Sequence, residues 1–438
     1  MPTVIRSFEA TRDRSEPLSE LVHTTFTTLP VSGTGVGAGT SSTTSSSVIA
    51  TDIYTYASMP TGGSRSAYAP TARPLSSAVD AVTTSGSSSS STPASPAPPT
   101  AMPSSGADGP TLGIVIAHPY PPLGGSKSDA VVRTLARLFI ETYGPMVVVY
   151  AFNFRGVTTR TSWTSRSEQQ DMFTVVSHML DAYASSLDTV LLAGYSYGGL
   201  VAGKVAAEHA SELARRDIYL SLFMLSPPFW PTAAALTFGF RARDVEPQIA
   251  QFAADAYIRT RKPSAAFLST EESRASNDRD SESSLAESNL RTDEELQRNR
   301  RAKAHQSRPF SDGKILLIYG TNDSFTRVRR YEKWTAAQRC KFVDVMLESW
   351  PNDDPANIQE DLGTEYNDKQ GYKLTDEEKR RINETMSESM IQTVQVDEGS
   401  HFWKPDEIKK DVWGNRIVRQ FVDRLLGLDP EDTDYLKY

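Results

Sequence analysis

The chain has 438 residues, a formal net charge of −8 at pH 7, and only 38% hydrophobic residues. The negative charge argues against a nucleic-acid partner, because such binding depends on neutralising phosphates. A single cysteine forms no internal disulfide, and no stretch reaches the roughly 20 apolar residues that span a bilayer. We therefore expect a cytoplasmic protein without an integral membrane segment.

Segments of low complexity divide the chain. Residues 60–110 are rich in serine and proline, and residues 269–308 are charged throughout. Such segments bury too little apolar surface to offset the entropy lost on ordering, so we predict that both are disordered. In chain order we expect a disordered N-terminus (1–20), a leading strand pair (21–59), a disordered Ser/Pro-rich insertion (60–110) and a first core segment (111–226). A cap insertion (227–268), a disordered charged insertion (269–308), a second core segment (309–428) and a tail (429–438) follow.

The ordered segments predict an α/β protein. Residues 21–30 and 47–59 carry β-branched and aromatic residues, as antiparallel strands do. From residue 111 onward, continuous Val/Ile/Leu runs alternate with stretches of helical spacing, which predicts a mostly parallel central sheet with helices on both faces. Buried strands are expected at 111–120, 145–156, 188–196, 217–229, 313–323 and 390–403, and helices at 128–144, 168–187, 197–216 and 413–428. Ser128 or Asp129 would cap the first helix, and Ile417, Phe421 and Leu425 share one face of the last.

Three reactive residue types follow predicted strands. Ser196 follows one strand within Gly194-Tyr195-Ser196-Tyr197-Gly198, Asp323 follows a later strand, and His401 follows the last. The carboxyl ends of parallel strands meet at one edge of a sheet. A serine hydroxyl needs a general base within hydrogen-bond reach, an imidazole titrates near neutral pH, and a carboxylate can fix the imidazole's tautomer.

Each of these residues also has a plainer interpretation, as a turn serine, a turn aspartate and a surface histidine. Asp397 and Glu398 compete with Asp323 for the role of the acid, but they lie too close in sequence to His401 to reach under its ring easily. The combination favours nucleophilic catalysis.

These motifs resemble the α/β-hydrolase superfamily, in which the nucleophile, acid and histidine follow one another in this chain order. The stretches HPYPPLGGS (118–126) and FNFRG (152–156) are similar to a small bacterial and fungal branch with an HP-type oxyanion strand. The resemblance covers residues 111–268 and 309–428. It implies a serine esterase without cofactor or metal. Together with the apolar insertion 227–268, it suggests a small-molecule carboxylic ester or thioester as the substrate.

An oxyanion hole needs two N–H donors. The N–H of Tyr197, at the start of a helix, is the first candidate. The second should come from the turn after residue 118, where Pro119, Pro121 and Pro122 have no N–H to give. Tyr120 is therefore the best second donor, with Leu123 in reserve.

The neighbouring residues carry further expectations. His118 would order the turn, and Arg155 would act as a structural ion-pair partner. Phe229 and Trp230 either line an acyl pocket or pack the cap onto the sheet, and the sequence favours neither.

Two other functions stay open: a serine peptidase, and a non-hydrolytic or inactive binding protein with the same fold. The simplest sign of a binding protein would be the loss of the serine, the acid or the histidine, and all three are present.

Overall fold

The computed structural model describes residues 6–7, 22–30, 48–56, 109–157, 165–229, 249–261, 313–349, 381 and 385–428. The predicted tail and charged insertion lie outside these residues. So does nearly all of the Ser/Pro-rich insertion, along with most of the N-terminal segment and more than half of the cap insertion. The disorder and the boundaries expected for these segments stay predictions.

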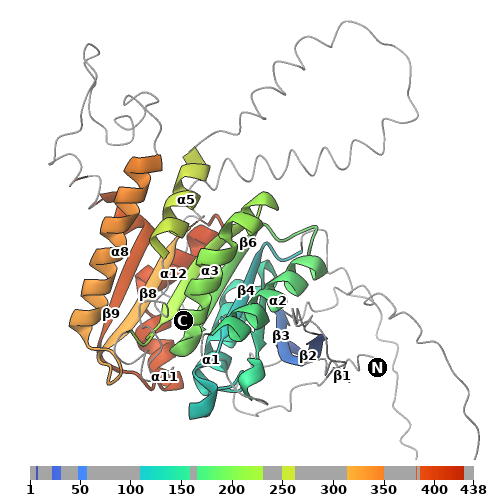
Figure 1. Ribbon diagram of the computed structural model, residues 1–438. Helices are drawn as coiled ribbons and strands as arrows, with labels where there is room; N and C mark the ends of the chain where they lie inside the picture. Colours follow the sequence, from blue (N-terminus) through green and yellow to red (C-terminus); the bar gives the residue numbers. More distant parts are fainter. Residues whose placement is uncertain are drawn as a thin grey trace, which may run out of the picture.

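The described strands form one nine-stranded sheet in the order β1-β2-β3-β5-β4-β6-β7-β8-β9 (Figure 1). The strands are β1 Arg6–Ser7, β2 Val22–Pro30, β3 Val48–Tyr56, β4 Leu112–Ala117, β5 Val147–Phe152, β6 Thr189–Tyr195, β7 Tyr219–Leu225, β8 Ile315–Asn322 and β9 Ile391–Ser400. The β1/β2, β2/β3 and β3/β5 pairs are antiparallel, and all the other pairs are parallel. The predicted α/β class and the leading strand pair are confirmed.

Helices cover both faces of the sheet. One core layer joins the strands to α2 Arg166–Ala182, α3 Tyr197–Arg215, α5 Ile249–Arg261 and α8 Val328–Ser349. The other joins them to α1 Ala130–Tyr143, the π-helix η6 Ile408–Trp413 and α12 Arg416–Leu425. Short helices lie in the connections: η2 Pro121–Leu123, η3 Gly144–Met146, η4 Arg155–Val157 and α11 Pro405–Glu407. No helix among the described residues is long and apolar enough to cross a membrane.

Local details of the helices partly match the sequence pattern. The Asp129 side chain accepts a hydrogen bond from the Val131 N–H at 2.8 Å and so caps α1. On α12, Phe421 and Leu425 are buried as expected, but Ile417 is 42% exposed. Ile417 lies one helical turn before Phe421 on the same side of α12, but in the first turn of the helix it is only partly covered.

Besides η6 and the short helices in the connections, three described elements have no counterpart in the expected strands and helices. β1 is a two-residue strand within the segment 1–20. α5 lies inside the predicted cap insertion, and its buried residues join those of α8 in one core layer. α8 spans 22 residues, and its buried positions include Tyr331, Trp334, Gln338 and Phe342. Their spacing of three and four residues is the helical period, and this signal could have identified α8.

The connections that leave β4 and β6 diverge at the carboxyl ends of these two strands. From β4 the chain runs through α1 to β5 on one side, and from β6 it runs through α3 to β7 on the other. α1 and α3 cover opposite faces. Ligands in open α/β sheets bind where the connections diverge in this way. The Ser196 turn and the turn after Ala117 both lie at this point.

Candidate active site

Ser196 sits on a sharp turn between β6 and α3. Its backbone has φ 53° and ψ −123°, a conformation that non-glycine residues rarely adopt. A Cβ atom on Gly194 would lie 2.3 Å from the carbonyl of Gly198, so the strand and the helix can approach this closely only with glycine there. The Ser196 N–H donates to the Leu225 carbonyl at 2.8 Å. This geometry is that of a nucleophile elbow.

The Ser196 hydroxyl reaches the imidazole of His401. The distance from Ser196 Oγ to His401 Nε2 is 2.8 Å, and both side chains are almost completely buried. The two residues are far apart in sequence and meet because β6 and β9 end at the same edge of the sheet. The Tyr195 hydroxyl donates to the His401 carbonyl at 2.7 Å and fixes the backbone that carries the ring.

Asp323 lies on the other side of the imidazole. His401 Nδ1 is 3.1 Å from each carboxylate oxygen of Asp323. Oδ1 also accepts hydrogen bonds from the backbone N–H groups of Phe325 and Thr326, and Oδ2 accepts one from the Tyr331 hydroxyl at 2.9 Å. These donors and the acceptor-only carboxylate place a proton on Nδ1 and leave Nε2 to accept from serine.

The charge of Asp323 is stabilised inside the protein. Burial alone raises the pKa of its carboxyl, but the hydrogen bond and charge of His401, together with the Thr326 and Tyr331 donors, outweigh it. They hold the pKa of Asp323 below its usual value. The competing acids lie differently, because Asp397 and Glu398 are exposed on β9. The structure therefore brings Asp323, rather than either rival, to the ring of His401.

Two phenylalanines flank the imidazole. The ring of Phe325 stacks on that of His401 with centroids 4.1 Å apart, and the ring of Phe402 lies edge-on at 5.5 Å. Phe402 is 64% exposed, so the edge of the site presents an apolar surface to solvent.

The turn after β4 lies against the start of α3. A Cβ atom on Gly198 would be 2.3 Å from the Ala117 carbonyl oxygen, so the chain leaving β4 rests directly on the first turn of this helix. The Tyr120 ring packs edge-on against the Tyr197 ring at a centroid distance of 5.0 Å. Both predicted oxyanion donors, Tyr120 and Tyr197, are thus brought together next to Ser196. The reserve donor Leu123 already gives its N–H to the Tyr120 carbonyl at 3.0 Å.

His118 is completely buried in this turn. Its Nε2 is 3.0 Å from the Phe154 N–H, and its Nδ1 is 2.6 Å from the Pro119 carbonyl oxygen. Burial lowers the pKa of His118 to about 4, although the Pro119 hydrogen bond opposes the shift. Because a backbone N–H only donates, the ring is neutral and its proton lies on Nδ1.

Arg155 pairs with Asp171 on α2, as expected of a structural ion pair. Its Nε and Nη2 donate to Asp171 Oδ1 at 2.8 and 2.5 Å, and its backbone N–H donates to Oδ2 at 2.8 Å. Burial raises the pKa of Asp171, and its bonds to Arg155 oppose the shift.

The two residues predicted for the substrate pocket have different outcomes. Trp230 lies outside the described residues. Phe229 is fully buried, and its ring stacks on that of Trp334 at 4.3 Å. Its N–H donates to Thr326 Oγ1 at 3.0 Å. This arrangement is the packing alternative for Phe229, and a role in an acyl pocket stays a prediction.

Two contributors to the site were missed from the sequence. Tyr331 donates to the acid from the first turns of α8, and the unrecognised helical spacing there was its signal. Asp171 is completely buried within α2 and anchors Arg155. A carboxylate on the buried side of an amphipathic helix is unusual unless it is paired, which is the signal that could have identified it.

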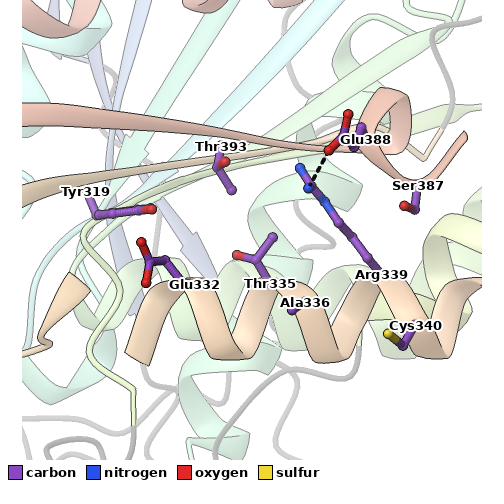
Figure 2. Close-up of a pocket in the computed structure, with 9 residues that line it drawn as sticks. All are labelled: Tyr319, Glu332, Thr335, Ala336, Arg339, Cys340, Ser387, Glu388 and Thr393. Carbon is purple, nitrogen blue, oxygen red and sulfur yellow. Dashed lines mark hydrogen bonds and ion pairs between the residues drawn. The ribbon is translucent and has the colours of Figure 1, made fainter. Parts of the chain in front are cut away.

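A separate pocket of about 330 Å³ lies between α8 and the strands β8 and β9. Figure 2 shows Glu332, Thr335 and Arg339 directed from α8 toward the strands, with Arg339 paired to Glu388 at 3.2 Å. None of Ser196, Asp323 and His401 lines this pocket. Tyr319, which lines this pocket, stacks on the ring of Tyr331, whose hydroxyl donates to Asp323. Among the described residues, no three His, Cys, Asp or Glu side chains form a group that could hold a metal ion.

Comparison with known proteins identifies the fold family. The alpha/beta hydrolase family profile matches residues 114–358, more than half of the chain. The chain belongs to the alpha/beta hydrolase family. The matched segment contains Ser196 and Asp323 and ends before His401. A search of curated proteins found no match.

Solved structures of low identity are also similar to this chain. An α/β serine hydrolase without lid from Xanthomonas campestris is 15% identical over 73% of this chain and 85% of its own, with a TM-score of 0.35. Est1E from Butyrivibrio proteoclasticus is 12% identical over 74% and 92%, with a TM-score of 0.33. An esterase from Pyrococcus furiosus is 15% identical over 53% and 69%, with a TM-score of 0.29. None of these likenesses bears on the reaction.

Proposed function

We propose that this chain is a serine hydrolase that cleaves a carboxylic ester or thioester of a small molecule through an acyl-enzyme on Ser196. One observation carries the proposal: Ser196 Oγ, the His401 ring and the Asp323 carboxylate form a continuous hydrogen-bonded series, with distances of 2.8 and 3.1 Å. From the composition, we also propose that the protein is located in the cytoplasm.

In the first half of the reaction, the Ser196 oxygen attacks the acyl carbon while His401 Nε2 takes the hydroxyl proton. The imidazolium that forms is stabilised by the Asp323 carboxylate, which stays ionised. The carbonyl oxygen becomes an oxyanion, which accepts hydrogen bonds from the N–H groups of Tyr197 and Tyr120. The helix N-terminus at Tyr197 adds a favourable dipole.

In the second half, His401 returns its proton to the leaving alcohol or thiol, and the acyl group remains on Ser196. A water molecule then gives its proton to His401 and attacks the acyl carbon. The bond from this carbon to Ser196 Oγ breaks as His401 passes the proton to Oγ, which releases the carboxylic acid and restores the serine. The exposed apolar ring of Phe402 beside the catalytic histidine supports an apolar group on the substrate.

Labelling with a fluorophosphonate probe, followed by a series of p-nitrophenyl esters of increasing acyl length, tests the proposal. We expect stoichiometric labelling and ester turnover, both of which are abolished in Ser196→Ala. Ser211→Ala, on the exposed side of α3, is the matched control and should behave like the wild type. Absence of labelling in the folded wild type would favour a binding protein, and turnover of amides at rates close to those of esters would favour a peptidase.

A further inference from the structure

The His118 ring joins two backbone segments at the edge of the site. Its Nδ1–H donates to the Pro119 carbonyl at 2.6 Å, and its Nε2 accepts the Phe154 N–H at 3.0 Å. The ring has no freedom to flip, because the flipped ring would break both bonds. It also packs against the Phe154 ring at a centroid distance of 4.6 Å.

The hydrogen bond from His118 to the Pro119 carbonyl also fixes the direction of the Tyr120 N–H. The Pro119 carbonyl and the Tyr120 N–H belong to one planar trans peptide unit, in which C=O and N–H point in opposite directions. Holding the Pro119 oxygen toward His118 therefore directs the Tyr120 N–H away from His118. Gly125 closes the other side, since a Cβ atom there would lie 2.2 Å from the Pro119 oxygen. The carbonyl is enclosed, and the orientation of this peptide is set.

The segment that carries the Phe154 N–H is also held in place. Phe154 precedes Arg155, whose backbone and guanidinium both bind the buried Asp171 carboxylate. The turn carries a further attachment to the same region, because the Lys127 N–H donates to Asn153 Oδ1 at 2.7 Å and Lys127 Nζ pairs with Asp52. The turn after β4 is thus held at both ends against the segment that follows β5.

We propose that His118 is a positioning residue that orients the Tyr120 N–H as the second oxyanion donor. Asp171 and Arg155 hold the Phe154 N–H against which the ring is set. This inference rests on the proposed function. His118 itself takes no proton from the substrate, since its ring is buried and both of its nitrogens are engaged with the backbone.

Two substitutions separate the two bonds of the ring. An asparagine places its amide near the position of Nδ1, so His118→Asn keeps a donor for the Pro119 carbonyl. A glutamine reaches the position of Nε2, so His118→Gln keeps an acceptor for the Phe154 N–H and loses the Pro119 bond. His118→Leu loses both. His178→Asn is the matched control, because this half-buried histidine on α2 lies near the Tyr150 ring and outside the turn.

The measurement is kcat and KM for a p-nitrophenyl ester, with each rate divided by the concentration of sites that a fluorophosphonate titrates. Removing an oxyanion donor lowers kcat by about 10²–10³-fold, so misdirecting one should lower it by about 10–100-fold. We expect this loss in His118→Gln and His118→Leu with KM nearly unchanged. His118→Asn should stay within about threefold of the wild type, and His178→Asn should match it. Inhibition by a trifluoromethyl ketone, which forms a tetrahedral adduct with an oxyanion, should weaken in parallel with kcat/KM.

Different results overturn different statements. If the wild type hydrolyses esters but His118→Gln is as active per site as His118→Asn, the positioning role is wrong. The same holds if activity is lost only in proportion to the titratable sites, because a purely structural role would produce that result. If the wild type neither labels nor turns over ester, the proposed function fails, and the role of His118 fails with it. If His118→Leu does not fold, the comparison of His118→Asn with His118→Gln alone tests the positioning role.

Discussion

The two sides of Ser196 are held by different parts of the chain. On one side, His401 and Asp323 are side chains that meet each other directly, and each is held by additional donors such as the Tyr195 and Tyr331 hydroxyls. On the other side, the turn from His118 to Gly125 carries the proposed oxyanion donor, the Tyr120 N–H, and the His118 ring binds the backbone groups of Pro119 and Phe154. A base and an acid require particular functional groups, whereas an oxyanion donor requires only an N–H in the right direction.

This difference predicts how substitutions will act. We call the side with His401 and Asp323 the histidine side and the side with residues 118–125 the turn side. A change on the histidine side should remove a chemical function outright, whereas a change on the turn side should misdirect a donor that is still present. The first kind should reduce the rate by about 10⁴-fold, and the second by about 10–100-fold.

The largest effect is expected from Asp323→Asn. The amide keeps the size of the side chain but favours the wrong imidazole tautomer, and such a change lowers kcat by about 10⁴-fold in a serine protease. Kinetics per titrated site, with circular dichroism as the check on folding, measure it. Asp397→Asn is the matched control, because this carboxylate is exposed on β9. If Asp397→Asn were the variant that lost activity, the assignment of Asp323 as the acid would be wrong.

The pH dependence of kcat/KM tests the same side. His401 must be neutral to take the serine proton, so kcat/KM should fall toward acid. The Asp323 carboxyl, whose pKa lies below its usual value, stays ionised from pH 5 to 8. The acid limb should therefore have unit slope, about tenfold per pH unit. A limb with a slope of two would mean that a second essential group titrates with His401, and a flat profile from pH 5 to 8 would argue against histidine as the base.

The sequence predicted the histidine side better than the turn side, for a physical reason. Ser196, Asp323 and His401 carry reactive side chains at the ends of predicted strands, and the alternation of buried strands and helices brings those ends to one edge. The direction of the Tyr120 N–H depends on the contacts of Pro119 with His118 and Gly125, which no single position encodes. The sequence could only assign this donor by eliminating prolines.

The same limit explains the missed helix α8. Its register depends on Tyr331, Trp334 and Phe342, which bury one side of a helix whose other side is rich in arginine, lysine and glutamate. The mean polarity of the segment concealed an apolar face with helical spacing. Tyr331 could not be linked to Asp323 until α8 was placed against β8.

An intermediate effect, on stability, is expected on the turn side. The pKa of His118 is about 4 in the folded protein, below the ordinary value of 6.5. As pH falls from 6.5 toward 4, the unfolded chain binds a proton at this position and the folded chain does not, so stability decreases through that window. Between pH 7.5 and pH 4.5 the wild type should lose about 2–3 kcal/mol more of its free energy of unfolding than His118→Asn, which has no titratable group there. Urea denaturation at the two pH values measures it, and equal losses in the two proteins would contradict a buried neutral imidazole.

The smallest effect is expected from Tyr331→Phe, which removes one donor from Asp323 and leaves the Phe325 and Thr326 N–H groups and His401 in place. A hydrogen bond to a charged group contributes about 1.5–3 kcal/mol, and the lower end applies because the other donors remain. The variant should lose about 1.5 kcal/mol of stability and turn over severalfold more slowly, since a carboxylate with one donor fewer holds the imidazole less firmly. Tyr150→Phe is the matched control: the Tyr150 hydroxyl is buried and has no hydrogen-bond partner among the described residues, so its removal should be neutral or stabilising. Equal losses of activity in the two variants would show that the hydroxyl of Tyr331 contributes nothing specific to the acid. The histidine side would then depend on the backbone donors as much as the turn side does.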